Sequence, residues 1–359
     1  MLWCLQKTQE YWWYVEAFCK RPERKELVQT PERIAQFRCY TPLTIGGSGG
    51  SVAKIKVRRT NREELPGLAV LRDAVAAELD AFPRHSGILD LDMELDPDLT
   101  HLITRDPDGF QTAEDKNETV GFAAGHVRSR QCVISEMWVL PQHRGRGAGD
   151  ALIKRMLIYG ERSGAREFLT VVPTQGVAQS LLLRHGFRPV APVYQLTIPP
   201  TEAPRIGHAL SRLMDGRDVT TDLFNRRGQA DLDRIDRLNR NIIRDADHQY
   251  WLKQRGLHAA FVRQGERIAA YAYGGRDQVG PVAGTTREAS ICALGWAINL
   301  ASEAAEEDDI LTVRIPAPFI EAVEAILDAG GRFEATLMIY GRDLKLSFDR
   351  CTLGHVALP

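Results

Sequence analysis

Residues 134–149 carry the most informative local pattern of the chain, Ile134-Ser135-Glu136-Met137-Trp138-Val139-Leu140-Pro141-Gln142-His143-Arg144-Gly145-Arg146-Gly147-Ala148-Gly149. Its first part is apolar and rich in β-forming residues, which predicts a strand. Pro141 ends that strand, because proline cannot donate a hydrogen bond to a sheet. After a glycine-rich turn, Leu152, Met156 and Tyr159 recur on one face at helical spacing, which predicts a helix.

A strand, a glycine turn and a helix start together form a binding site for an anion. The first N–H groups of a helix lack partners inside it, and the helix dipole adds positive charge at that end. Gly145, Gly147 and Gly149 let the backbone approach a phosphate closely, while Arg144 and Arg146 add charge. No Gly-Lys-Ser/Thr follows, so this is not a Walker loop, and the acidic residue of a dinucleotide site is not clearly placed.

The spacing Gln142-x-x-Gly145-x-Gly147 resembles the acyl-CoA pyrophosphate loop of the GNAT acetyltransferases. The downstream pattern predicts a strand over 167–172, a short helix over 175–184 and a strand near 193–198, an order similar to that of the GNAT core. Ala178 and Gly186-Phe187 stand where the last helix of the family carries alanine and Gly-Phe. The resemblance implies an α/β fold (an α+β mixed sheet) that is mostly antiparallel, splayed and flanked by helices.

Upstream, the pattern predicts strands over 55–58 and 101–105, and a helix from Asn61 to about residue 80. The polar, turn-rich residues 106–117 are typical of a loop, and a hairpin over 120–127 and 132–139 leads into the central stretch. In the family the first helical region helps to shape the acceptor site. Its candidates here are Asp80, Arg84, His85, Asp90 and Asp92, which could equally be solvated loop residues.

The second half of the chain resembles a diverged copy of the first. Residues 168–173 recur as 310–316, Gly186 recurs as Gly330, and residues 120–123 recur as 268–271, at separations of 142 to 148 residues. Further elements are predicted as helices over 231–245, 288–305 and 318–329, and as strands over 259–263 and 335–340. At the same offset the copy has no Gly-x-Gly, so we expect the second half to bind no coenzyme A.

The chain is therefore interpreted as two GNAT-like domains in tandem, similar to tandem-GNAT acetyltransferases with a degenerate second copy. Residues 52–199 are the expected catalytic domain, 200–217 a linker with some helix, 218–345 the degenerate domain and 346–359 a tail. Residues 1–51 end in a Gly/Ser linker and form an N-terminal extension. This extension is either poorly ordered or a docking helix, or natural translation begins at Val52.

The composition excludes several classes of function. A net charge of −1 gives no electrostatic case for binding nucleic acid or an anionic membrane. No apolar run reaches the roughly 20 residues of a membrane span. The six cysteines show no metal-binding spacing, so we expect no metal, free thiols and a cytoplasmic location. The expected partners are acetyl-CoA and an amine acceptor, and the expected state is a monomer or homodimer.

The resemblance assigns the residues that contact acetyl-CoA. The turn from Arg144 to Gly149 provides N–H donors for the pyrophosphate, and one backbone N–H near Trp138 to Leu140 polarises the thioester carbonyl. The strands splay there, which leaves such groups to the ligand. The full set is Trp138, Val139, Leu140, Gln142, His143, Arg144, Gly145, Arg146, Gly147, Ala148, Gly149, Gln175 and Ala178.

Acetyl transfer also requires a base and a departing thiolate. Glu136 is the first candidate base, because the family often places a glutamate on this strand; it could instead be a solvent-facing or paired strand residue. His126 is the second candidate, and it could instead be a structural histidine. The tyrosine that the family uses as the acid falls at Leu182, so Tyr194 on the next strand could substitute for it or could be a half-buried structural residue. A thiol of pKa about 8.5 can also leave without an acid.

Two functions follow from these residues. The first is an acetyl-CoA-dependent N-acetyltransferase that acts on a primary amine of a small molecule or peptide. The second is a catalytically weak acyl-CoA sensor, suggested by Leu182 and the degenerate copy. A polar and aromatic run in the second half either covers the acceptor site or forms an exposed helix end; it comprises Arg240, Arg244, Asp245, Asp247, His248, Tyr250 and Trp251.

Overall fold

The computed structural model describes residues 55–79, 97–174, 176–212, 219–220, 226–276, 278–306, 309–355 and 359. The first half contains, in chain order, β1 (Lys56–Arg59), α3 (Leu65–Leu79), α4 (Pro97–Arg105), β2 (Phe110–Asp115), β3 (Glu118–Arg128), β4 (Gln131–Val139), α5 (Ala148–Arg162), β5 (Glu167–Pro173), α6 (Gly176–Arg184) and β6 (Arg188–Ile198). The expected N-terminal extension, residues 1–51, lies outside the described residues.

The second half repeats this order. It contains α8 (Arg226–Arg240), α9 (Asp245–Lys253), β8 (His258–Gln264), β9 (Arg267–Gly275), β10 (Gln278–Gly284), α10 (Arg287–Ala304), β11 (Leu311–Pro316), α11 (Ile320–Asp328) and β12 (Arg332–Arg342). The short strands β7 (Val219–Thr220) and β13 (Cys351–Thr352) precede and follow these elements. Between the halves, the residues expected as a linker hold α7 (Ala203–Ser211).

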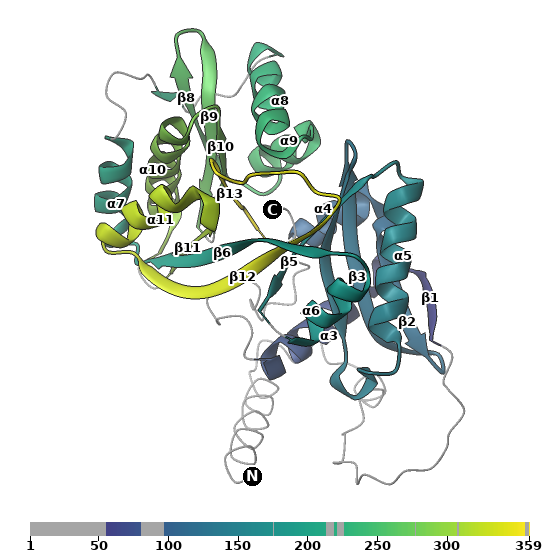
Figure 1. Cartoon of the computed structure of the whole chain (residues 1–359). Coiled ribbons are helices and arrows are strands. Elements are labelled where there is room, and N and C mark those ends of the chain that lie inside the picture. Colours follow the sequence, from purple (N-terminus) through teal and green to yellow (C-terminus); the bar gives the residue numbers. More distant parts are fainter. Residues whose placement is uncertain are drawn as a thin grey trace, which may run out of the picture. The chain divides into compact units, whose positions relative to one another are not determined.

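One continuous sheet joins the two halves by exchanging their last strands. Its order is β1-β2-β3-β4-β5-β12-β6-β11-β10-β9-β8-β7, with β13 beside β10. The last strand of the second half, β12, pairs with β5 of the first, while β6 of the first half pairs with β11 of the second. Figure 1 shows β12 (yellow) alongside β6 (teal), with which it is antiparallel. The sheet therefore runs without a break across the expected domain boundary.

Within the described part of the chain, three hydrophobic cores cover the faces of this sheet. On one face of the first half, α5 and Leu182 of α6 pack over β3 to β5. On one face of the second half, α7, α10 and α11 pack over β9 to β11. The third core is shared, because residues of α3 and α4 and residues of α8 and α9 belong to one buried cluster. The inner helices of both halves therefore fill a single interior.

Several predicted elements were wrong, for identifiable reasons. Residues 101–105 belong to helix α4, not to a strand, and Leu99, Leu102 and Ile103 form its buried face. Residues 110–115 form strand β2, not a loop, because their polar side chains are buried under α5 and between strands. The single helix expected over 231–245 is two helices, α8 and α9. Strand β10 was not predicted at all.

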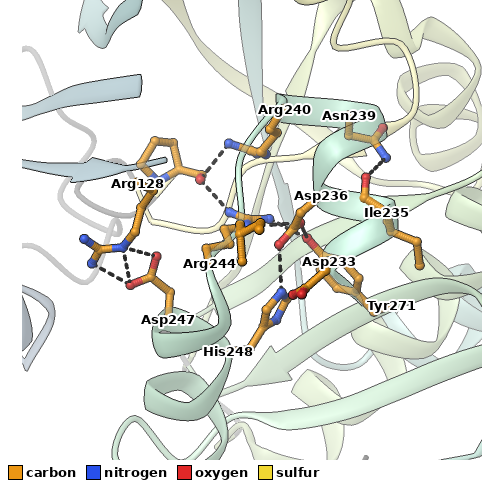
Figure 2. Close-up of polar contacts among 12 residues, drawn as sticks. Arg128, Asp233, Ile235, Asp236, Asn239, Arg240, Arg244, Asp247, His248 and Tyr271 are labelled. Atoms are coloured by element: carbon orange, nitrogen blue, oxygen red, sulfur yellow. Dashed lines mark hydrogen bonds and ion pairs between the residues drawn. The ribbon is translucent and has the colours of Figure 1, made fainter. Parts of the chain in front are cut away.

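Apart from the exposed Asp245, the polar run of the second half is buried, so it is not an exposed helix end. The Arg128 guanidinium on β3 contacts the Asp247 carboxylate on α9 at 2.7 Å (Figure 2). It also contacts the Asp106 carboxylate at 2.9 Å. Burial alone would raise the pKa of Asp247, but Arg128 and a hydrogen bond from His101 hold it well below its usual range. Asp247 thus ties the second half to the first as a buried anion.

Replacing Asp247 with asparagine is expected to destabilise the protein by about 3–5 kcal/mol, because it leaves the buried Arg128 cation without its main partner. Urea unfolding measures the loss. Asp106→Asn is the matched control, since Arg128 then keeps Asp247, and its effect should be clearly smaller. Equal effects of the two variants would show that Asp247 is not the dominant partner.

Candidate functional site

The site begins where β4 and β5 separate. These parallel strands pair only from Gln131 opposite Glu167 to Ile134 opposite Thr170, although each strand continues beyond this point. At the last pair, the Thr170 hydroxyl donates to the Ile134 carbonyl at 2.8 Å. A fork therefore opens between residues 135–139 and residues 171–173, as the sequence predicted. Among the described strands, only β3 and β5 pair with β4.

The backbone direction along β4 identifies which N–H group faces the fork. The Leu140 N–H donates to the Val120 carbonyl at 2.9 Å, so it points toward β3. Val139 lies opposite Gly121, and successive residues of a strand direct their amides to opposite sides. The Val139 N–H consequently points into the fork, on the side where β5 has diverged. Of the three residues that the sequence proposed, Leu140 is thus excluded as the donor.

The glycine turn joins β4 to α5 in a conformation that glycine favours. Gly145 has φ 72° and Gly147 has φ 93°, both in the left-handed region. Gly147 is also the N-cap of α5 and provides no side-chain hydrogen bond to the helix. The first N–H groups of α5 are therefore available to an external anion. An added Cβ would meet no atom within 4 Å at either glycine, so backbone conformation, not space, requires glycine here.

The charged side chains around the glycine turn favour the binding of an anion. Arg146 is exposed, and the Arg144 guanidinium folds back to the Val139 carbonyl at 3.3 Å. The acidic residue of the first turn, Asp150, pairs with Lys154 at 2.7 Å and with His185 at 2.8 Å. The hydrogen bond from Lys154 lowers the pKa of Asp150 most. The Lys154 ammonium therefore offsets the Asp150 carboxylate near the helix start.

The remaining residues of the predicted cofactor set lie around the fork and turn. Gln142 and His143 are half-buried in the 3-10 turn between β4 and Arg144, and His143 lies 3.5 Å from the Asp115 carboxylate. Trp138, Ala148 and Gly149 lie at the end of β4 and the start of α5, and a Cβ on Gly149 would contact Leu181 of α6. Ala178 is half-buried on α6, and Gln175 lies outside the described residues.

Glu136 is buried on the face of β4 that carries α3. Its carboxylate accepts a hydrogen bond from the Trp138 indole N–H at 3.0 Å. The Arg72 guanidinium of α3 lies 3.8 Å from the same carboxylate, with both side chains almost inaccessible. Glu136 is therefore neither solvent-facing nor isolated. The sequence pattern gave no signal for Arg72, because only the packing of α3 against β4 brings it to this place.

His126 is buried on β3, where its Nδ1 lies 3.2 Å from the Ser135 hydroxyl. Burial, with a contribution from Arg128, lowers its pKa to about 3. An imidazole with such a pKa is a weak base at neutral pH. It also lines a small cavity with Arg128, Arg240 and other residues of the shared interior, which places it away from the turn.

The low pKa of His126 predicts a dependence of stability on pH. The folded-state pKa, about 3, lies below the unfolded value near 6.5, so the unfolded chain binds a proton first as the pH falls. Stability should then decrease between pH 6 and 4.5 by at most about 1.4 kcal/mol per unit. Unfolding curves at both pH values should show a shallower decrease for His126→Gln. An unchanged slope would mean that His126 is not buried in its neutral form.

Strand exchange moves Tyr194 away from the fork. β12 lies between β5 and β6, so the strand that carries Tyr194 is not the neighbour of β5. The Tyr194 ring contacts Phe333 of β12, with ring centroids 5.8 Å apart, and packs against the core of the second half. Leu182, at the position of the family tyrosine, is buried in the core under α5.

None of the described helices is long and apolar enough to cross a membrane. Residues 72–187 match the acetyltransferase (GNAT) family model. An uncharacterized N-acetyltransferase of Methanocaldococcus jannaschii is 38% identical over 72 residues, which are 18% of this chain and 32% of that protein. The chain therefore matches about a third of the length of this curated relative.

Two solved structures share the fold over most of the chain. A putative acetyltransferase from Pyrococcus horikoshii is similar over 88% of this chain and 96% of its own, with a TM-score of 0.61 and 16% identity. A tandem GNAT protein from the clavulanic acid biosynthesis pathway is similar over 80% of this chain and 98% of its own, with a TM-score of 0.52 and 13% identity. Residues 72–187, which hold the splayed fork and the glycine turn, thus match the GNAT acetyltransferase family, and the chain with its repeated order of elements has the fold of tandem GNAT structures.

Proposed function

We propose that the protein is an acetyl-CoA-dependent N-acetyltransferase whose reaction takes place in the fork of the first half. The observation that supports this most directly is the fork itself, which leads from the Val139 N–H to the uncapped start of α5. The extended arm of acetyl-CoA fits beside the open edge of β4, as a further strand would. A pyrophosphate fits at the glycine turn, where helix N–H groups and Arg146 attract negative charge.

In this proposal the bound acetyl-CoA supplies an acetyl group activated as a thioester. The Val139 N–H donates to the thioester carbonyl oxygen as negative charge develops there. The amine must attack in its unprotonated form, and Glu136 accepts its proton, directly or through one water. The new C–N bond forms as the C–S bond breaks, and the thiolate leaves with the sulfur electron pair. Trp138 and Arg72 hold the Glu136 carboxylate in place.

The departing thiolate has no hydroxyl donor from Leu182, which is a buried aliphatic side chain. Its ordinary pKa of about 8.5 allows departure near neutral pH, with the proton coming from solvent. His126 and Tyr194 take no part in the proposed steps, the first because it is a weak base and the second because β12 separates it from the fork. We assign both side chains a structural role in the packing of the two halves.

Calorimetry with acetyl-CoA tests the binding, and an acceptor screen that follows thiol release tests the transfer. We expect binding at or below tens of micromolar and turnover on at least one primary amine of a small molecule or peptide. Absence of binding at that concentration would refute the proposal. Binding without turnover on any amine would instead favour the acyl-CoA sensor, for which the buried Leu182 is the specific observation.

A further inference from the structure

The second half also contains a fork, but its own chain fills it. β10 and β11 stand in the places of β4 and β5, and they are parallel at one pair, Val279 opposite Val313. Beyond that pair β10 continues to Gly284 and β11 continues to Pro316, so the two strands separate. The repeat thus preserves the divergence that opens the candidate site of the first half.

Residues 351–353 lie between these two strands. Cys351 and Thr352 pair antiparallel with Ala283 and Val282 of β10, and the Val282 N–H donates to the Thr352 hydroxyl at 3.0 Å. The Leu353 N–H donates to the Arg314 carbonyl of β11 at 2.9 Å. The segment therefore bridges both strands of the fork. Its three residues are completely buried, so it is an integral part of the interior.

The preceding residues cover the start of α10, the counterpart of α5. The Ser290 hydroxyl donates to the Arg350 carbonyl at 2.7 Å, and the Arg350 guanidinium donates to the Thr285 carbonyl at 3.1 Å. The Asp349 carboxylate lies 3.4 Å from the guanidinium of Arg287, the first residue of the helix. An acidic group thus lies at this helix start, where the first half offers a site for an anion.

The helix start itself differs from that of α5. Thr286 caps α10, and its hydroxyl accepts a hydrogen bond from the Ala289 N–H at 3.2 Å. One of the N–H groups that α5 leaves available is therefore satisfied within α10. A side chain at the cap and an acidic residue nearby both oppose the entry of a phosphate.

We propose that residues 349–353 are an intramolecular ligand of the second half. Strand β13 takes the place of an acyl-CoA arm, and the Asp349 carboxylate takes the place of the acyl-CoA phosphates. The comparison with acyl-CoA rests on the proposed function of the first half. The contacts of residues 349–353 with β10, β11 and α10 do not depend on that proposed function. Two consequences follow: the chain binds one acyl-CoA, and loss of the segment opens the second fork.

Leu353→Pro in the full chain tests the segment, because proline removes the N–H that donates to Arg314. Lys345→Pro is the matched control, since Lys345 lies in the same part of the chain but is exposed and outside any strand. Hydrogen exchange of residues 279–284 and 311–316 should rise at least about tenfold in Leu353→Pro, as expected for loss of one or more buried hydrogen bonds, and stay unchanged in the control. Calorimetry should give one acetyl-CoA per chain in the wild type.

Unchanged exchange at β10 and β11 in Leu353→Pro would overturn the proposal, as would two acetyl-CoA molecules per wild-type chain. If Leu353→Pro fails to fold, Thr352→Val removes only the acceptor of the Val282 N–H, and the rise in exchange should then be confined to β10. Exchange that rises as predicted in a chain that binds no acetyl-CoA would support the role of the segment and refute the function proposed for the first half.

Discussion

Replacing Gly147 with valine is expected to weaken acetyl-CoA binding at least about tenfold while leaving the fold intact. Gly147 has φ 93°. An L-residue in this region costs roughly 1–2 kcal/mol, more for a β-branched side chain, and about 1.4 kcal/mol corresponds to a factor of ten in binding. The turn can relieve this strain by moving, which misplaces the N–H groups at the start of α5. Calorimetry measures the loss.

The chain offers a close control for this experiment. Gly164 follows the other end of α5, with φ 86° and no atom within 4 Å of an added Cβ. Gly164→Val should therefore cost a similar amount of folding stability without disturbing the anion turn. If both variants lose affinity equally, the effect of Gly147→Val arises from general destabilisation of α5 and not from the turn.

Replacing Glu136 with glutamine is expected to decrease kcat by about 10²- to 10⁴-fold, the usual contribution of a general base. The amide keeps the size of the carboxylate but cannot accept the proton of the amine. The acetyl-CoA affinity should stay within a few-fold of the wild type, because the glycine turn is unaffected. Thiol release with an acceptor found in the screen measures kcat.

Trp138→Phe is the control for Glu136. It removes the indole N–H that donates to the carboxylate but leaves the carboxylate in place. We expect a decrease in rate of less than about tenfold, since one hydrogen bond contributes on the order of 1 kcal/mol. A Glu136→Gln variant that keeps more than half of the wild-type rate would exclude Glu136 as the base.

Local patterns predicted the elements whose signals lie within one segment. β4, the glycine turn and α5 combine a β-rich run, a proline stop and helical spacing, and all three are present. Asn61 also precedes a helix, as predicted, and forms a capping box with Glu64. In contrast, residues 101–105 suggested a strand, although Leu99, Leu102 and Ile103 have helical spacing. β10 contains Gly280, Pro281 and Gly284, a composition typical of a loop.

The site was predictable only where it depends on one strand and one turn. The resemblance to the GNAT family implied the splay of β4 from β5, and the three glycines of the loop indicated a turn that needs the conformational freedom of glycine. The contact of Arg72 with Glu136 depends on how α3 packs, and the neutral state of His126 depends on burial by the second half. Tyr194 was misplaced because the sequence gives no indication that β12 inserts between β5 and β6. Such pairings arise between residues more than a hundred positions apart.

The exchange of β6 and β12 has a consequence for how the chain folds during its synthesis. The first half lacks the neighbour of β5 until residues 332–342 have left the ribosome. Until then β5 presents an open edge, and β6 lacks β12, while its other partner, β11, emerges only with residues 311–316. Exposed edges of this kind invite pairing with other chains. The two halves therefore mature together, and a nascent chain released before residue 342 is an aggregation hazard.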